Sequence, residues 1–168
     1  MNINGAYGVD MAQTVCLDTN IVIWGILGQG KAEDELKREK AVHLLEMLQQ
    51  QNDRVLLPTI VLAEVVAKVS PPDREEVVSK LSSACEIVPF DAGSAMEFST
   101  VRTVGMKKKS REFPRKEISL DSLIVAICRR QDVQILYTND DNLRKLAAHF
   151  MRVEELPDIP QKQLSLLV

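Results

Sequence analysis

The sequence predicts an α/β fold, a three-layer α/β/α sandwich with a mainly parallel central sheet. Short apolar runs of strand length alternate along the chain with longer segments that have helical periodicity. Strands that alternate with helices are joined by right-handed crossovers, which produce a parallel sheet covered by helices on both faces. No internal repeat, low-complexity tract or interior linker divides the 168 residues, so one folded domain is expected.

The first half of the chain begins this alternation at Thr14. An apolar run that ends in an acid predicts a strand over 14–18, and the apolar stretch over 20–28 predicts a helix after a sharp turn. Ala41 and nearby leucines at helical spacing predict an amphipathic helix over 33–51. The same criteria then predict a strand at 54–58, helices at 59–69 and 73–84, and a strand at 85–90.

The second half continues the alternation after residue 90. The expected elements are a helix at 91–104, a basic stretch at 107–116, a helix at 118–131, a strand at 133–138, a helix from near Asp141 and a strand near 151–154. Residues 1–13 are polar and without periodicity, so a flexible N-terminal arm is expected there. We therefore expect the folded domain to span 14–154 and residues 155–168 to form a C-terminal tail.

Composition narrows the class of protein. A hydrophobic share of 45% and a charged share of 27% are typical of a soluble globular protein. No apolar run approaches the roughly 18 residues of a membrane span and the first residues do not resemble a signal peptide, so a cytoplasmic location is expected. The scattered cysteines Cys16, Cys85 and Cys128 are interpreted as buried apolar residues. A formal charge of −3 means that binding of nucleic acid would require a local basic patch.

Four acidic residues fall where the local pattern predicts an apolar residue or the end of a strand. Asp18 ends the first predicted strand, and Asp140 lies just after the strand at 133–138. In open parallel sheets, ligands bind outside the carboxyl ends of the strands, so both acids should lie on one edge. Glu64 and Asp121 instead occupy predicted helices whose neighbouring positions are apolar.

Several buried carboxylates would repel one another unless a cation joined them. Ligands that offer only oxygen suit a hard cation, Mg²⁺ or Mn²⁺, and such a site favours phosphodiester hydrolysis. Three of the acids also have a structural explanation: Asp140 as the N-cap of the helix at Asp141, Asp121 near a helix N-terminus, and Glu64 paired with Lys68. Spacing alone leaves these alternatives open.

Four short motifs together resemble the PIN-domain ribonuclease family, in particular VapC-like toxins. They are Asp18-Thr19-Asn20, Leu62-Ala63-Glu64-Val65, Asp121 at the start of an apolar helix, and Thr138-Asn139-Asp140. The resemblance spans roughly residues 14–154 and depends on the order of the motifs, since each alone is weak. The arm and the tail depart from the compact toxins of this type.

The resemblance implies a metal-dependent endoribonuclease that cuts RNA. By position, the catalytic and metal-binding residues are Asp18, Glu64, Asp121 and Asp140, with support from Thr19, Asn20 and Thr138. It further implies Mg²⁺ or Mn²⁺ as cofactor, a homodimer, and an antitoxin protein as partner. Trp24 is expected in the core or at a dimer contact, and Thr19 and Asn20 could equally be turn or cap residues.

The segment at 106–117 is the strongest basic cluster of the chain. Its basic residues are Lys107, Lys108, Lys109, Arg111, Arg115 and Lys116. Because the cluster directly precedes the helix that carries Asp121, we predict that it binds the RNA backbone beside the metal site. The alternative interpretation is a solvated surface loop or a dock for an acidic partner tail.

Two other functions compete with the nuclease. The first is a catalytically silent PIN-like scaffold that binds RNA or protein. The second is a doubly wound phosphotransfer or phosphatase domain, whose chemistry also starts from an aspartate at the end of a strand. The second fits less well, because Asp18-Thr19-Asn20 has no second acid nearby and the chain has no GxxxxGK[ST] motif.

Overall fold

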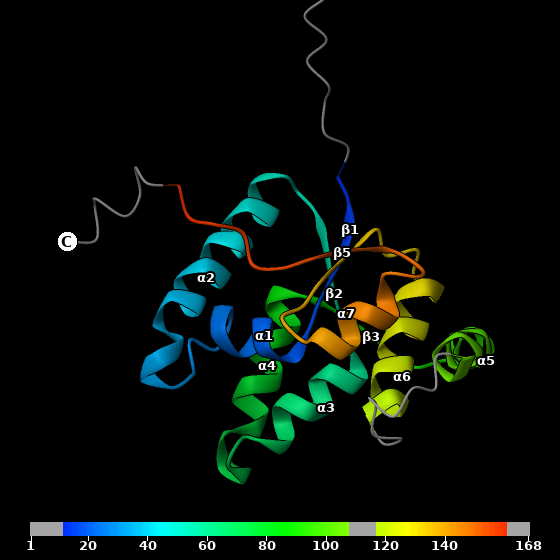
Figure 1. The fold of residues 1–168 in the computed structure, drawn as a ribbon. Helices are drawn as coiled ribbons and strands as arrows, with labels where there is room; N and C mark the ends of the chain where they lie inside the picture. Colours follow the sequence, from blue (N-terminus) through cyan, green and yellow to red (C-terminus); the bar gives the residue numbers. More distant parts are fainter. Residues whose placement is uncertain (1–11, 108–116, 161–168) are drawn as a thin grey trace, which may run out of the picture.

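The computed structural model describes residues 12–107 and 117–160, in which five strands form one sheet (Figure 1). The strands are β1 (Thr14–Leu17), β2 (Arg54–Pro58), β3 (Glu86–Val88), β4 (Ile135–Tyr137) and β5 (Arg152–Glu154). Their order in the sheet is β3-β2-β1-β4-β5, and every neighbouring pair is parallel. The predicted α/β class with a parallel sheet is therefore confirmed.

Seven α-helices connect and cover these strands within the described ranges. They are α1 (Thr19–Gly25), α2 (Glu35–Gln50), α3 (Thr59–Ala67), α4 (Arg74–Ala84), α5 (Ala92–Lys107), α6 (Glu117–Arg130) and α7 (Asp141–Ala147). Figure 1 shows α1 and α2 on one side of the central strands and α5 and α6 on the other. This arrangement is the one that right-handed crossovers produce in a sheet of this order. None of the described helices has the length and apolarity that crossing a membrane requires.

The core forms around β1, which is the central strand. Val15, Cys16 and Leu17 are fully buried, because helices cover both faces of the sheet at this position. All three cysteines are buried and free, as predicted. Trp24 is only 8% exposed and belongs to the core, with the Lys37 ammonium 5.0 Å from the centre of its ring. The tight packing of this core holds the carboxyl ends of β1 and β4 in place.

Several helices and strands begin or end one to three residues away from their predicted bounds. The helix expected over 20–28 ends at Gly25, and the strand expected over 85–90 ends at Val88. Pro89 follows that strand and has no N–H with which to continue the pairing. The strand expected from residue 133 begins at Ile135, where pairing with Val15 starts. Strand ends depend on the neighbouring strand, which a single sequence does not display.

Residues 155–160 extend beyond β5 without regular structure, yet side chains of this segment contact the domain. Leu156 is buried, Glu155 pairs with Arg144 at 2.9 Å, and Asp158 pairs with Lys40 of α2 at 2.6 Å. This part of the predicted tail therefore packs on the domain. Residues 1–11 of the predicted arm, 161–168 of the tail and 108–116 of the basic cluster lie outside the described residues.

Candidate active site

A cavity of about 360 Å³ opens where the strands β1 and β4 end. Its lining residues are Asp18, Thr19, Asn20, Glu64, Ala67, Lys68, Asp121, Ile124, Asp140 and Leu143. The strands β1 and β4 are parallel neighbours, so the chain leaves both at the same edge of the sheet. Helices α3 and α6 bring the other two acids to that edge. All four acids singled out in the sequence therefore face one cavity.

Asp18 is the most buried of these acids, with 6% of its surface exposed. It caps the N-terminus of α1, where its Oδ1 accepts a hydrogen bond of 2.6 Å from the backbone N–H of Thr19. The Thr138 hydroxyl donates a bond of 2.8 Å to its Oδ2. Burial raises the pKa of Asp18, the two hydrogen bonds oppose this shift, and the charges of Glu64 and Asp140 add to it. The buried site thus disfavours a further negative charge.

Glu64 lies on α3 and is half-buried. The Thr19 hydroxyl donates a hydrogen bond of 2.5 Å to its Oε2. Thr19 therefore links two acids, binding Asp18 through its backbone and Glu64 through its side chain. The alternative in which Glu64 forms an ion pair with Lys68 is not realised among the residues that the structure describes.

Asp140 combines two roles that the sequence presented as alternatives. It is the N-cap of α7, because its Oδ1 accepts bonds from the backbone N–H groups of Asn142 at 2.7 Å and Leu143 at 2.9 Å. It also lines the cavity, and its own N–H donates to the Thr138 hydroxyl at 3.0 Å. Asp141 is exposed and pairs with Arg144 at 3.0 Å, as expected of an acid in the first turn of a helix.

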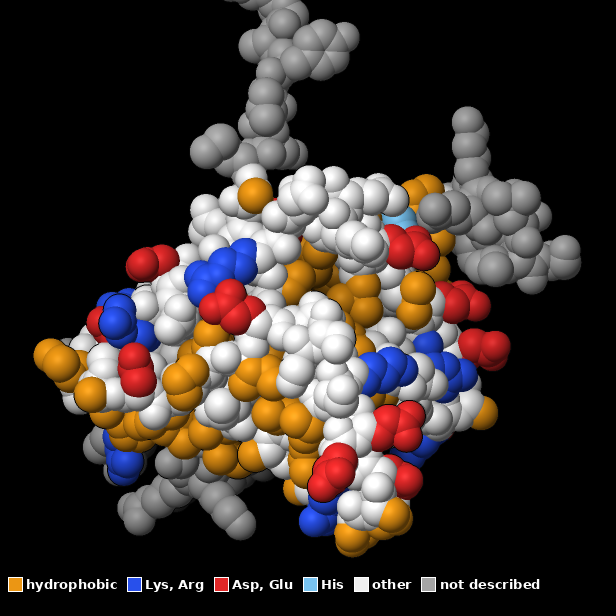
Figure 2. Space-filling model, turned by 180° about the vertical axis from the view of Figure 1, so that it is seen from behind, with side chains coloured by type: hydrophobic (Ala, Val, Ile, Leu, Met, Phe, Trp, Pro, Cys, Tyr) orange, Lys and Arg blue, Asp and Glu red, His pale blue; other side chains and the backbone are white. Residues whose placement is uncertain are grey.

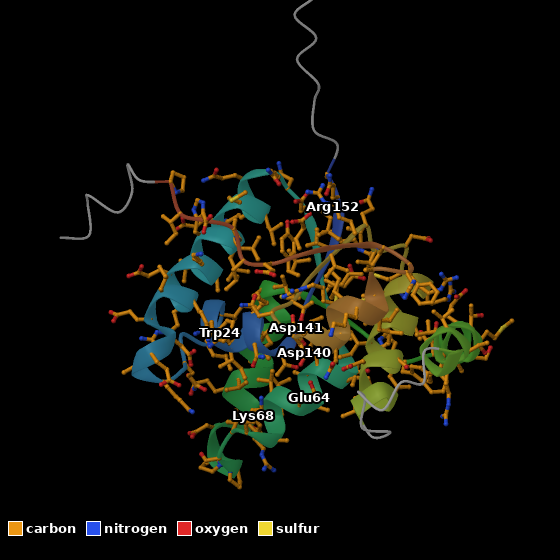
Figure 3. All side chains as sticks on the ribbon, viewed as in Figure 1. Trp24, Glu64, Lys68, Asp140, Asp141 and Arg152 are labelled. Carbon is orange, nitrogen blue, oxygen red and sulfur yellow. The ribbon has the colours of Figure 1, made fainter. Side chains whose placement is uncertain are left out.

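The remaining predicted residues divide into three groups. Asp121 of α6 and Asn20 line the cavity, and both are half-buried. Thr138 lies beneath it, fully buried, and contacts Asp18 and the backbone of Asp140. The predicted RNA-binding residues lie where nothing is described, except that Lys107 is the last residue of α5. Figure 3 shows Glu64 and Asp140 near one another, between α3 and α7.

Sequence reasoning missed the part that Lys68 takes in this cavity. It considered Lys68 only as an ion-pair partner of Glu64, whereas the structure makes it a lining residue. The signal was present, because residues four apart in a helix share a face. Ile124 and Leu143 form the apolar wall, which follows from the helical periodicity of α6 and α7.

The donor set fits a hard divalent cation by its chemistry. Four carboxylates around one cavity, with hydroxyl and amide groups beside them, offer oxygen ligands of the kind that Mg²⁺ and Mn²⁺ prefer. Within 12–107 and 117–160, however, no three His, Cys, Asp or Glu side chains stand close enough together to hold a metal ion as they are placed. Mutual repulsion of the carboxylates favours this spacing, and a bound cation would have to draw them together.

Fold and site define a class: a parallel α/β domain with an acid-lined cavity at the carboxyl ends of its strands. The chain matches the model of the PIN domain family over residues 15–149, and it belongs to that family. Comparison with curated protein sequences gives no match.

The chain is also similar to solved structures of toxin–antitoxin proteins. One is VapBC2 from Rickettsia felis bound to a DNA fragment from its promoter, at 23% identity and a TM-score of 0.62, over 86% of this chain and 100% of that one. A toxin–antitoxin complex from Klebsiella pneumoniae gives 20% identity and a TM-score of 0.59, over 87% of this chain and 100% of that one. VapC20 of Mycobacterium tuberculosis is described as a sarcin-ricin loop cleaving toxin. It gives 17% identity and a TM-score of 0.53, over 82% of this chain and 96% of that one. At these identities the likeness supports the fold alone.

Proposed function

We propose that this protein is a metal-dependent endoribonuclease, with Mg²⁺ or Mn²⁺ held by Asp18, Glu64, Asp121 and Asp140. The observation that carries the proposal is the convergence of these acids, from four separate segments, on one cavity. Membership of the PIN domain family and the similarity to VapC20, which is described as a sarcin-ricin loop cleaving toxin, support it. The cavity is open to solvent on a protein surface, as a polymeric substrate requires.

The side chains around the cavity have distinct tasks in this proposal. Thr138 and the N–H of Thr19 orient the two oxygens of Asp18. The Thr19 hydroxyl fixes Glu64, and the N-terminus of α7 fixes Oδ1 of Asp140. A bound divalent cation would stabilise charge on the phosphate oxygens and supply an activated water. Three of the four proposed ligands, Asp18, Glu64 and Asp140, are thus each held by hydrogen bonds from the chain.

We further propose that the protein is the toxin of a toxin–antitoxin pair, with RNA as substrate, an antitoxin protein as partner and a homodimer as the assembled form. The Rickettsia felis and Klebsiella pneumoniae structures are toxin–antitoxin complexes, which supports the pairing by analogy of fold. Coexpression with the product of any small neighbouring gene, followed by co-purification, tests the partner directly.

The decisive experiment for the nuclease is cleavage of mixed RNA by metal-free protein, with and without added Mn²⁺ or Mg²⁺. The expected result is internal cleavage only when metal is added. Asp18→Asn is the matched control, since it removes one ligand charge and keeps the shape of the side chain. Equal cleavage by the wild type and Asp18→Asn would place the activity elsewhere. RNA binding without cleavage by the wild type would favour the silent scaffold.

A further inference from the structure

Lys68 is the only basic side chain among the described residues that line the acidic cavity. It follows α3 directly and ends that helix, with its backbone N–H donating to the carbonyl groups of Val65 and Val66. The residue stands one helical turn after Glu64, so its side chain leaves α3 on the same side. Figure 3 shows Glu64 on α3 and Lys68 at the C-terminal end of that helix. A positive charge is thereby placed at the rim of a site that otherwise carries carboxylates.

The charge of Lys68 is not neutralised by an ion pair within the described part of the chain. Other basic residues with an acid nearby do form such pairs: Lys40 with Asp158 at 2.6 Å, and Arg144 with Asp141 at 3.0 Å. The Lys68 side chain is also exposed, so it is free to reach a ligand that enters the cavity. Its charge is therefore available to an anion.

An anion that enters this cavity needs such a charge. Phosphates of RNA would meet the carboxylates that line the walls, and repulsion would weaken their binding. Figure 2 shows that basic and acidic side chains are interspersed on the face it presents. Among the described residues that line the cavity, Lys68 alone offers a positive charge. A lysine ammonium is a compact point charge with three donors, which suits a phosphate oxygen.

We propose that Lys68 binds a non-bridging oxygen of an RNA phosphate at the mouth of the cavity and is a substrate-binding residue of the active site. This inference rests on the proposed nuclease function and names the side chain that grips the substrate there. It is independent of the basic cluster at 107–116, because Lys68 directly follows α3 and lines the cavity itself. The rival role is electrostatic: Lys68 would hold the carboxylates together in the metal-free protein and have no contact with RNA.

The test uses Lys68→Ala and Lys68→Arg, with Lys80→Ala as control. Lys80 is an exposed lysine on α4 that does not line the cavity. Cleavage of a single-stranded RNA is measured at saturating Mn²⁺ across RNA concentrations. Binding of the same RNA is measured over a range of salt concentrations, with each variant placed in the Asp18→Asn protein so that RNA stays intact.

Lys68→Ala is expected to raise KM and the RNA dissociation constant about two- to fivefold, with a smaller change in kcat. The logarithmic slope of binding against salt should fall by roughly 0.7, the value for one lost phosphate contact on a single strand. Lys68→Arg should retain most of the binding, and Lys80→Ala should match the wild type. The concentration of Mn²⁺ that gives half-maximal cleavage should be nearly the same in all variants.

Three outcomes would overturn the inference: unchanged RNA binding in Lys68→Ala, an unchanged salt slope, or a change confined to the Mn²⁺ requirement. The last of these would assign Lys68 the electrostatic role among the carboxylates. Failure of the proposed function looks different, because the wild type itself would then fail to cleave RNA with either metal. Salt-dependent binding by the Asp18→Asn protein would still report on Lys68 in that case.

Discussion

Thr138→Val tests the hydrogen-bonding arrangement beneath the cavity. Thr138 is fully buried, and its hydroxyl donates to Asp18 at 2.8 Å while accepting from the N–H of Asp140 at 3.0 Å. Valine has the same shape without the hydroxyl. The bond to a carboxylate contributes about 1.5–3 kcal/mol and the backbone bond about 0.5–1.5 kcal/mol, so the free energy of unfolding should fall by about 2–4.5 kcal/mol.

Unfolding in urea, followed by the fluorescence of the single buried Trp24, measures this loss. For a chain of this size the melting temperature should fall by roughly 5–15 °C. Thr103→Val is the matched control, because Thr103 is exposed on α5 and its hydroxyl bonds only the Ser99 carbonyl of its own helix. The free energy of unfolding of that variant should stay within about 0.5 kcal/mol of the wild-type value.

Cleavage should fall in Thr138→Val as well, since Asp18 loses the donor that fixes its Oδ2. Thr138→Ser keeps the hydroxyl and should recover most of the activity. A Thr138→Val protein as stable as Thr103→Val, with an unchanged m value, would refute the reasoning. It would mean that Asp18 and Asp140 do not depend on this hydroxyl.

Two further predictions concern charge in the site and beside it. Asp18→Asn should abolish cleavage, and its stability relative to the metal-free wild type should improve as pH rises. Burial raises the pKa of Asp18 above its ordinary value of 3.8, so the wild type loses stability as pH rises from about that value through the raised pKa, whereas the variant has no carboxylate there to ionise. Urea unfolding at several pH values measures this, and a constant difference would contradict it. Changing Lys107, Lys108 and Lys109 to Ala should weaken RNA binding, with metal affinity unchanged. The logarithmic slope of RNA binding against salt should fall by roughly 0.7 for each phosphate contact that is lost. An unchanged slope would show that this segment is a surface loop that does not contact RNA.

Much of the site could be predicted from the sequence because two simple geometric rules govern it. Asp18 and Asp140 follow neighbouring parallel strands, and such strands end at one edge of a sheet. Glu64 and Asp121 interrupt apolar helical patterns, which implies that they face inward. Convergence then follows once the order of the strands is known.

What could not be predicted depends on distances between segments remote in the sequence. The hydrogen bond from Thr19 to Glu64 joins residues 45 positions apart, and the bond from Thr138 to Asp18 joins residues 120 apart. The residue types allow these bonds, but only the folded chain specifies them. Lys68 was overlooked for a related reason: its nearest acid in the sequence is Glu64, whereas in the fold it faces the whole cavity.

Asp140 shows how one carboxylate can serve both the helix and the site, and a matched pair of variants separates the two roles. Its Oδ1 caps α7, which leaves Oδ2 for a cation. Asparagine caps helices as well as aspartate does, so Asp140→Asn should lower the free energy of unfolding by less than about 1 kcal/mol. Cleavage should nevertheless be lost.

Asp141→Asn removes a neighbouring charge in the same helix turn, together with its exposed ion pair to Arg144. It should therefore lower the free energy of unfolding by a similar amount. Because Asp141 does not line the cavity, that variant should still cleave RNA. Thermal unfolding and RNA cleavage of both proteins make the comparison. If the two variants lost cleavage equally, the loss would come from the helix terminus and its dipole. Loss in Asp140→Asn alone, at equal stability, would assign the effect to the carboxylate that faces the cavity.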